Sequence, residues 1–321
     1  MKNILLFMTD FYNYNYDIIN EMEKQKCAVK WYQDKINFSF LDTILSKMCK
    51  NYKINKFNKY FDGIIKNEKG NKYDEIVIIF GAGFMNETHL EVLKKTFPQT
   101  PIVYYAWDSV ANFPSIKSLF AGADRSYSFD KNDCFKYGVE FLPLFYLSKS
   151  DSDSKKNKWD VSTIMSFYNK KSNSLRRLFD VLPNGLNEYF FLRIRSKEYY
   201  MFMKIFHRKN FKKFKNYLTL SSLNRDECLN IIKNSVAVID CPVPNQNGLT
   251  MRTFEALAMN TKLITSNINV AEYEFFTPNN IFIVDSNTSE IPLSFFSTPF
   301  DMQFQISEKY SLKHFVEVLI Q

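Results

Sequence analysis

Residues 247–258 read NGLTMRTFEALA, and residues 261–267 read TKLITSN. The pattern predicts a loop that turns at Gly248, a helix that begins in that loop, and a strand that returns to the same edge of a sheet. The first amides of a helix have no partner inside the helix, so a helix start is suited to binding an anion. This stretch therefore predicts a β/α unit with an anion site at the start of its helix.

Two charged side chains share one face of that helix. Arg252 lies in the first turn, where its guanidinium can share a diphosphate. Glu255 follows three residues later on the same face, and its carboxylate can accept hydrogen bonds from both hydroxyls of a ribose. The loop residues that we expect to face the same ligand are Asn247, Gly248, Leu249 and Thr250.

The order Gly-Leu-Thr-x-Arg-x-x-Glu-Ala-Leu-Ala, followed by a short apolar strand, resembles the donor half of GT-B glycosyltransferases. The likeness is to bacterial enzymes that assemble capsule, lipopolysaccharide and spore-coat glycans. Many members carry two glutamates eight residues apart, and the second corresponds to Glu255 and holds the nucleotide ribose. The first would fall at position 247, which is Asn in this chain. The alternative is an ordinary α/β helix–strand unit with Arg252 and Glu255 as a surface ion pair.

The composition is that of a folded protein with about two domains, since the chain has 321 residues, 45% of them hydrophobic and 24% charged. The five cysteines are scattered, which favours reduced thiols in the cytoplasm. The apolar run at residues 4–8 is too short for a signal peptide, and no run approaches the roughly 20 apolar residues that span a bilayer. We expect a cytoplasmic protein.

The first half alternates strands and helices. Apolar runs at residues 4–8, 28–32, 76–80 and 101–107 predict buried parallel strands, and residues 16–24 and 87–95 have helical spacing. We therefore expect an N-terminal Rossmann-like domain at residues 1–150, and the resemblance implies that this domain binds the acceptor.

A polar run at residues 149–158 predicts a linker, after which the alternation restarts. We expect a second Rossmann-like domain at residues 158–306, and the resemblance implies that this domain binds the nucleotide-sugar. The resemblance further implies that the C-terminal segment 307–321 returns to the first domain. The predicted fold class is thus α/β, with two Rossmann-like domains facing each other across a cleft in the GT-B architecture.

Ligands of such sheets bind at the carboxyl ends of the strands. In the first domain this rule selects acceptor-binding candidates in three loops: Phe11, Tyr12, Gly83 and Trp107. Asp108 follows a buried strand and is the candidate general base, because inverting sugar transfer needs a group that takes the acceptor proton. The alternative for Asp108 is a turn cap.

In the second domain the same rule selects the loop after the first strand. The resemblance implies that this loop closes over the donor diphosphate, with Tyr168, Asn169 and Lys170 as candidate contacts. Asp240 ends a strand beside the Gly248 turn and is a candidate for the base or sugar pocket. Asp151 and Asp153 form an Asp-x-Asp motif, but the motif stands in a Ser/Lys run rather than after a buried strand. We therefore expect no metal and no cofactor beyond the nucleotide-sugar substrate.

Residues 193–215 hold nine Lys or Arg and one Glu, a net charge of +8, interleaved with Tyr, Phe and Met. The whole chain has 42 − 34 = +8, so this segment carries the excess. Basic and aromatic residues together are typical of a protein segment that binds an anionic membrane surface. A solvated connector helix is the alternative, and we expect no nucleic acid because no reader motif accompanies the charge.

The resemblance therefore implies a metal-independent glycosyltransferase that moves a sugar from a nucleotide-sugar to a glycan or lipid-linked acceptor in bacterial surface polysaccharide biosynthesis. The basic segment suggests that it acts at the inner face of the membrane. Two alternatives stay open. One is a GT-B-like nucleotide-sugar epimerase, and the other is a non-catalytic subunit of a glycan-assembly complex, which Asn247 favours.

Overall fold

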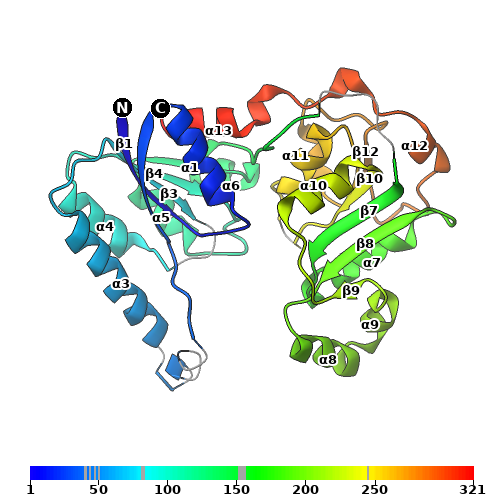
Figure 1. The fold of residues 1–321 in the computed structure, drawn as a ribbon, viewed down its shortest axis with the longest axis horizontal. Helices are drawn as coiled ribbons and strands as arrows, with labels where there is room; N and C mark the ends of the chain where they lie inside the picture. Colours follow the sequence, from blue (N-terminus) through cyan, green and yellow to red (C-terminus); the bar gives the residue numbers. More distant parts are fainter. Residues whose placement is uncertain are drawn as a thin grey trace. The chain divides into compact units, whose positions relative to one another are not determined.

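The computed structural model describes residues 1–39, 42, 45–46, 48–49, 51–80, 84–150, 157–243 and 246–321. The chain forms two compact units (Figure 1). Unit 1 comprises Met1–Pro143 and Leu312–Gln321, and unit 2 comprises Leu144–Ser311. Residues 144–150 belong to unit 2 because their backbone bonds to it: the amide of Ser150 donates to the carbonyl of Ala258 (2.8 Å).

Within its described residues, unit 1 is built on one parallel sheet in the order β2-β1-β3-β4-β5-β6. The strands are β1 (Lys2–Met8), β2 (Cys27–Tyr32), β3 (Glu75–Phe80), β4 (Ile102–Ala106), β5 (Arg125–Ser128) and β6 (Glu140–Phe141). The central strands are continuous apolar runs because helices cover both faces of the sheet. Tyr104 packs on Phe120 and its neighbour Tyr105 on Phe315, since successive residues of a strand point to opposite faces.

The helices of unit 1 are α1 (Tyr14–Lys24), α3 (Tyr52–Glu68), α4 (Glu87–Thr96), α5 (Ile116–Gly122), α6 (Lys131–Tyr137) and α13 (Leu312–Leu319). Helices α3, α4 and α5 bury one face of the sheet, and α1 and α13 pack together on the other (Figure 1). The sequence interpretation did not include α3, although its buried Phe57, Phe61 and Ile64 have helical spacing.

Unit 2 has a second parallel sheet, in the order β12-β11-β10-β7-β8-β9 among the residues described there. Its strands are β7 (Trp159–Ser166), β8 (Glu188–Arg193), β9 (Leu218–Thr219), β10 (Ser235–Asp240), β11 (Lys262–Thr265) and β12 (Ile281–Ile283). Its helices are α7 (Ser172–Asp180), α8 (Lys197–Phe206), α9 (Arg208–Phe214), α10 (Arg225–Lys233), α11 (Met251–Ala258) and α12 (Leu293–Ser297).

Both sheets have a topological switch point, where consecutive connections leave in opposite directions. In unit 1 it lies between β1 and β3, and in unit 2 between β7 and β10. Open α/β sheets bind ligands beyond the carboxyl ends of the strands at such a point. The loops after β1, β3, β7 and β10 are therefore where this fold places its ligand groups.

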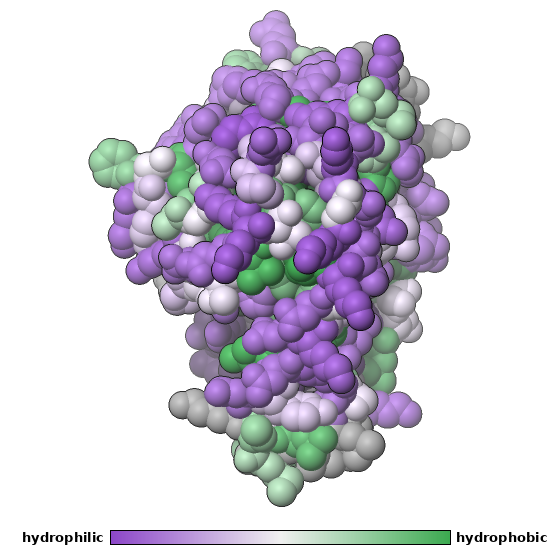
Figure 2. Space-filling model, turned by 90° about the vertical axis from the view of Figure 1, so that its left-hand side faces the viewer, coloured by the Kyte–Doolittle hydropathy of each residue, from purple (hydrophilic) through white to green (hydrophobic). Residues whose placement is uncertain are grey.

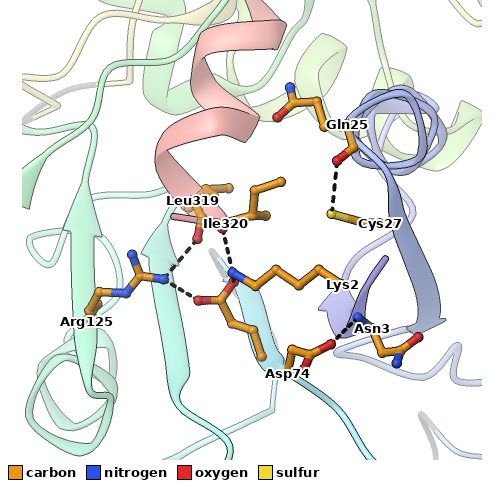
Figure 3. Close-up of polar contacts among 9 residues, drawn as sticks. Lys2, Asn3, Gln25, Cys27, Asp74, Arg125, Leu319 and Ile320 are labelled. Atoms are coloured by element: carbon orange, nitrogen blue, oxygen red, sulfur yellow. Dashed lines mark hydrogen bonds and ion pairs between the residues drawn. The ribbon is translucent and has the colours of Figure 1, made fainter.

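Helix α13 is held to unit 1 by a charged cluster below its C-terminal end (Figure 3). The ammonium of Lys2 donates to the carbonyl of Ile320 (2.5 Å), and Arg125 donates to that of Leu319 (3.5 Å). Both cations also pair with the carboxylate of Glu75, which is 1% exposed. Two cations at the negative end of a helix stabilise it, and Glu75 fixes both in place.

Candidate functional site

The carboxyl end of β10 is joined to the start of α11 by one buried carboxylate. Oδ2 of Asp240 accepts hydrogen bonds from the hydroxyls of Thr250 (2.8 Å) and Thr253 (3.2 Å). Thr250 is the N-cap residue of α11, yet its side chain bonds to Asp240 and makes no cap hydrogen bond. Burial raises the pKa of Asp240, while the two hydroxyls, Lys171 and Arg252 act in the opposite direction. The start of α11 is thus fixed against the switch point of unit 2.

Arg252 and Glu255 form a partly buried pair rather than a surface ion pair. Nη1 of Arg252 lies 3.0 Å from Oε2 of Glu255, and Nη2 donates to the carbonyl of Ile164 on β7 (3.3 Å). The side chains are 20% and 8% exposed. The guanidinium therefore spans from α11 to β7 across the switch point, next to a carboxylate. A cation and a hydrogen-bond acceptor are thereby presented at one edge of the sheet.

The loop before α11 is held by three amide side chains. Asn267 donates to the carbonyls of Asn247 (3.0 Å) and Gly248 (3.3 Å), and Asn269 donates to that of Asn247 (3.1 Å). Gln246 also donates to the carbonyl of Gly248 (3.3 Å), while Leu249 is buried. The sequence interpretation did not assign a role to Asn267 or Asn269, which follow β11 and reach back across the edge of the sheet.

The loop after β7 is also fixed, and it brings a different lysine to the site. The amide of Asn169 donates to the Tyr199 hydroxyl (2.8 Å), and the side chain of Asn210 donates to Oδ1 of Asn169 (3.3 Å). Lys170 is exposed. Lys171 is the lysine that acts electrostatically on Asp240, and its ammonium lies 5.5 Å from the ring centroid of Tyr168. Position 171 therefore joins Tyr168 and Asn169 as a candidate.

Two carboxyl groups, the buried Asp34 and the half-buried Asp108, occupy the carboxyl edge of the sheet in unit 1. Burial raises the pKa of Asp108, which follows β4, to about 6. Burial also raises the pKa of Asp34, which follows β2, to about 6, and the Thr9 hydroxyl donates to its Oδ1. The sequence interpretation missed Asp34, although the rule that selects Asp108, an acid just after a strand, applies to both. Each group titrates in a range useful for proton transfer.

The aromatic candidates of unit 1 have two different environments. Phe11 and Tyr12, after β1, are 48% and 58% exposed, with ring centroids 4.6 Å apart. Tyr12 and Asn13 have left-handed backbones (φ 49° and 64°), a strained conformation that clusters at functional sites. Trp107 instead packs near Tyr14 and Phe315, at 5.9 and 6.4 Å between ring centroids.

Gly83, the remaining acceptor candidate, lies outside the described residues, as do Asp151 and Asp153. Within the described ranges, no three His, Cys, Asp or Glu side chains are grouped as metal ligands would be. No helix in the described part of the chain has the length and apolar character needed to cross a bilayer.

Comparison with known proteins establishes the fold. The chain is similar to HepE of Anabaena, solved with UDP and glucose, at 11% identity and a TM-score of 0.58, covering 99% of this chain and 95% of that one. A Rickettsia africae glycosyltransferase matches at 12% identity and a TM-score of 0.56, covering 99% and 94%. UDP-GlcNAc 2-epimerase from Neisseria meningitidis, bound to UDP-GlcNAc, matches at 12% identity and a TM-score of 0.58. This match covers 100% of this chain and 98% of the epimerase. No protein-family model and no curated protein matches.

These structures share the α/β arrangement of two Rossmann-like units, so the predicted GT-B fold class is confirmed. At such low identity the likeness concerns the fold alone.

Proposed function

We propose that this chain is a glycosyltransferase that takes a sugar from a nucleotide-sugar bound at the carboxyl edge of unit 2. The observation that supports this most directly is the arrangement of Arg252 and Glu255 across the unit 2 switch point, with α11 fixed there by Asp240. In the proposal Glu255 accepts from the ribose hydroxyls, and Arg252 binds the diphosphate with the amides at the start of α11.

The leaving nucleoside diphosphate gains negative charge as the glycosidic bond breaks. In the proposal Arg252 and Lys171, together with the amides before and within the first turn of α11, stabilise that charge. No metal takes part in the proposed reaction. The other donor contacts we propose are Tyr168, Asn169, Lys170, Asp240, Asn247, Leu249 and Thr250.

Unit 1 supplies the acceptor site in this proposal, with Asp108 as the general base. A base must be deprotonated to accept the acceptor proton, and a pKa of about 6 leaves Asp108 ionised at neutral pH while retaining basicity. The exposed pair Phe11 and Tyr12 offers ring faces to a sugar, and Gly83 and Trp107 complete the proposed acceptor residues.

The acceptor we propose is a glycan or a lipid-linked glycan of bacterial surface polysaccharide assembly. The reaction would take place in the cytoplasm at the inner face of the membrane, with contact through residues 193–215. An epimerase that uses the same donor site is the second candidate, favoured by the likeness to the Neisseria meningitidis enzyme over nearly the full length of both chains.

Donor binding is tested by thermal shift with UDP-, GDP-, CMP- and dTDP-sugars. We expect one nucleotide class to raise the melting temperature by mass action, and UDP-sugars are the first choice because HepE was solved with UDP-glucose. Glu255→Gln and Arg252→Lys should abolish most of the shift. Glu274→Gln is the matched control, because it removes a carboxylate from an exposed ion pair with Lys309 elsewhere in unit 2.

The variant Asp108→Asn tests the catalytic step independently of donor binding. It should keep the donor shift and lower kcat of transfer or donor hydrolysis about 10²–10⁴-fold. Absence of a shift with every donor, from a chain that melts cooperatively, contradicts the donor site and favours the non-catalytic subunit. Epimerised donor without an acceptor product favours the epimerase.

A further inference from the structure

Helix α8 presents apolar side chains that unit 2 does not bury. Met201, Phe202, Ile205 and Phe206 are 48%, 43%, 51% and 69% exposed. They form two pairs four residues apart, so all four occupy one side of the helix. Met203, on another side of α8, is fully buried in the core of unit 2. The helix therefore binds its own unit through one side and leaves an apolar face outward.

The basic residues of the chain concentrate on the same helix pair. Residues 193–215 carry nine Lys or Arg against Glu198, a net of +8 that equals the net charge of the whole chain. All nine are exposed: Arg193, Arg195, Lys197, Lys204, Arg208, Lys209, Lys212, Lys213 and Lys215. Two of them, Lys197 and Lys204, lie on α8 itself. Figure 1 shows α8 and α9 at one end of unit 2, beyond the edge strand β9.

The exposed apolar row of α8 coincides with the segment that carries the charge surplus of the chain. The side of unit 1 that Figure 2 shows is predominantly hydrophilic, with apolar atoms in separated groups. Phe135, the most exposed phenylalanine of the described residues, is on α6, where it stands without a comparable row of apolar neighbours. Single exposed apolar residues are normal on a protein surface, whereas a contiguous row beside a charge surplus marks an interaction site.

We propose that α8 and α9 form a docking element for an anionic lipid surface, with the face Met201–Phe202–Ile205–Phe206 inserted at the headgroup boundary. The inference rests on the membrane contact included in the proposed function and assigns it to one helix face. An amphipathic helix with basic flanks lies in the membrane interface in this way. A nucleic acid would satisfy the lysines and arginines through its phosphates, but it gives Met201 and Ile205 no apolar environment. An anionic lipid surface binds the basic side chains through its headgroups and the apolar side chains at the acyl boundary.

The test is sedimentation of the full chain with vesicles of phosphatidylcholine alone and of phosphatidylcholine with phosphatidylserine. We expect binding to the anionic vesicles that falls with added salt, and little binding to the neutral ones. The double variant Phe202→Ser, Phe206→Ser should weaken binding about tenfold or more. The triple variant Lys204→Gln, Arg208→Gln, Lys209→Gln should weaken it by a similar factor.

Two matched controls use exposed positions elsewhere. The apolar control is Phe135→Ser with Leu293→Ser, at side chains 96% and 62% exposed. The charge control is Lys59→Gln, Lys66→Gln, Lys69→Gln in unit 1, which makes the same change in net charge. Both controls should bind the anionic vesicles as the unaltered chain does.

Equal loss in the controls, or no vesicle binding by a cooperatively folding chain, would overturn the proposal. Binding of an RNA or DNA oligonucleotide that the α8 and α9 variants abolish, with vesicle binding absent, would overturn it in favour of nucleic acid. Donor-induced thermal shifts measured on the same variants without vesicles should be unchanged. A failure of the lipid proposal is thereby distinguished from a failure of the donor site.

Discussion

Asp34 shows at the scale of one residue how burial couples a site to stability. The carboxyl group is 0% exposed, the Thr9 hydroxyl donates to Oδ1, and burial raises its pKa to about 6. A folded-state pKa above the unfolded value means that the folded chain holds its proton more tightly. The stability contribution of Asp34 is therefore full below pH about 4 and is lost as pH rises through about 6.

We predict that Asp34→Asn stabilises the chain at pH 7.5 by about 1–3 kcal/mol, because the amide keeps an acceptor for Thr9 and removes a buried charge. At pH 4 the gain should vanish. Urea unfolding at both pH values measures the difference, and Asp10→Asn, in the exposed loop after β1, is the control. A gain that is equal at both pH values contradicts the assigned protonation.

At the scale of the element, α11 illustrates how a local pattern and a non-local contact combine. The sequence predicts its start near Gly248 and the shared face of Arg252 and Glu255. The bonds that fix the helix come from Asp240 at the end of β10, which accepts from Thr250 and Thr253. Burial raises the pKa of Asp240, while these two hydrogen bonds, Lys171 and Arg252 favour its charged form. A hydrogen bond to a charged group contributes more than one to a neutral group.

We therefore expect Thr253→Val to destabilise the chain by about 1.5–3 kcal/mol and to weaken donor binding, since the start of α11 loses one of its two bonds to β10. Thr261→Val is the matched control, because the Thr261 hydroxyl donates to a neutral carbonyl, that of Ile232 (2.9 Å). Chemical denaturation should give the control a smaller loss of about 0.5–1.5 kcal/mol and no change in the donor-induced shift. Equal losses would show that Asp240 is uncharged in the folded chain.

At the scale of the whole molecule, the return of α13 to unit 1 joins the two ends of the described chain. Phe315, Val316 and Leu319 are buried, and Glu75 holds Lys2 and Arg125 beneath the last carbonyls of the helix. Removal of one partner from a buried ion cluster leaves the others poorly paired. Here both cations retain some solvent contact, with side chains 30% and 28% exposed, which reduces the loss.

We predict that Glu75→Gln destabilises unit 1 by about 1–3 kcal/mol and raises amide exchange in α13, where the capping cations lose their anchor. Lys94→Gln, which breaks an exposed pair with Asp124 (3.2 Å), should change stability by less than about 1 kcal/mol. Hydrogen exchange by mass spectrometry with denaturant unfolding reports both quantities. Unchanged exchange in α13 for Glu75→Gln would contradict the role of the cluster.

The sequence by itself determined the fold class and selected the residues of the proposed site. Continuous apolar runs predict β1, β3 and β4 because strands buried on both faces need them, and helical spacing predicts the shared face of Arg252 and Glu255. The rule that ligands lie after the strands also selects Asp108, Tyr168 and Asp240 before any coordinates are known.

Only the tertiary structure decided which distant groups meet. The Thr9–Asp34 bond, the placement of Lys171 near Asp240, the bonds of Asn267 to the loop before α11, and the Glu75 cluster all join residues far apart in sequence. The exposure of the apolar face of α8 is likewise visible only in the tertiary structure. A sequence pattern shows only the periodicity of apolar residues along the chain. The contacts between distant residues depend on the order of the strands in the sheet and on which face of each helix packs against the core.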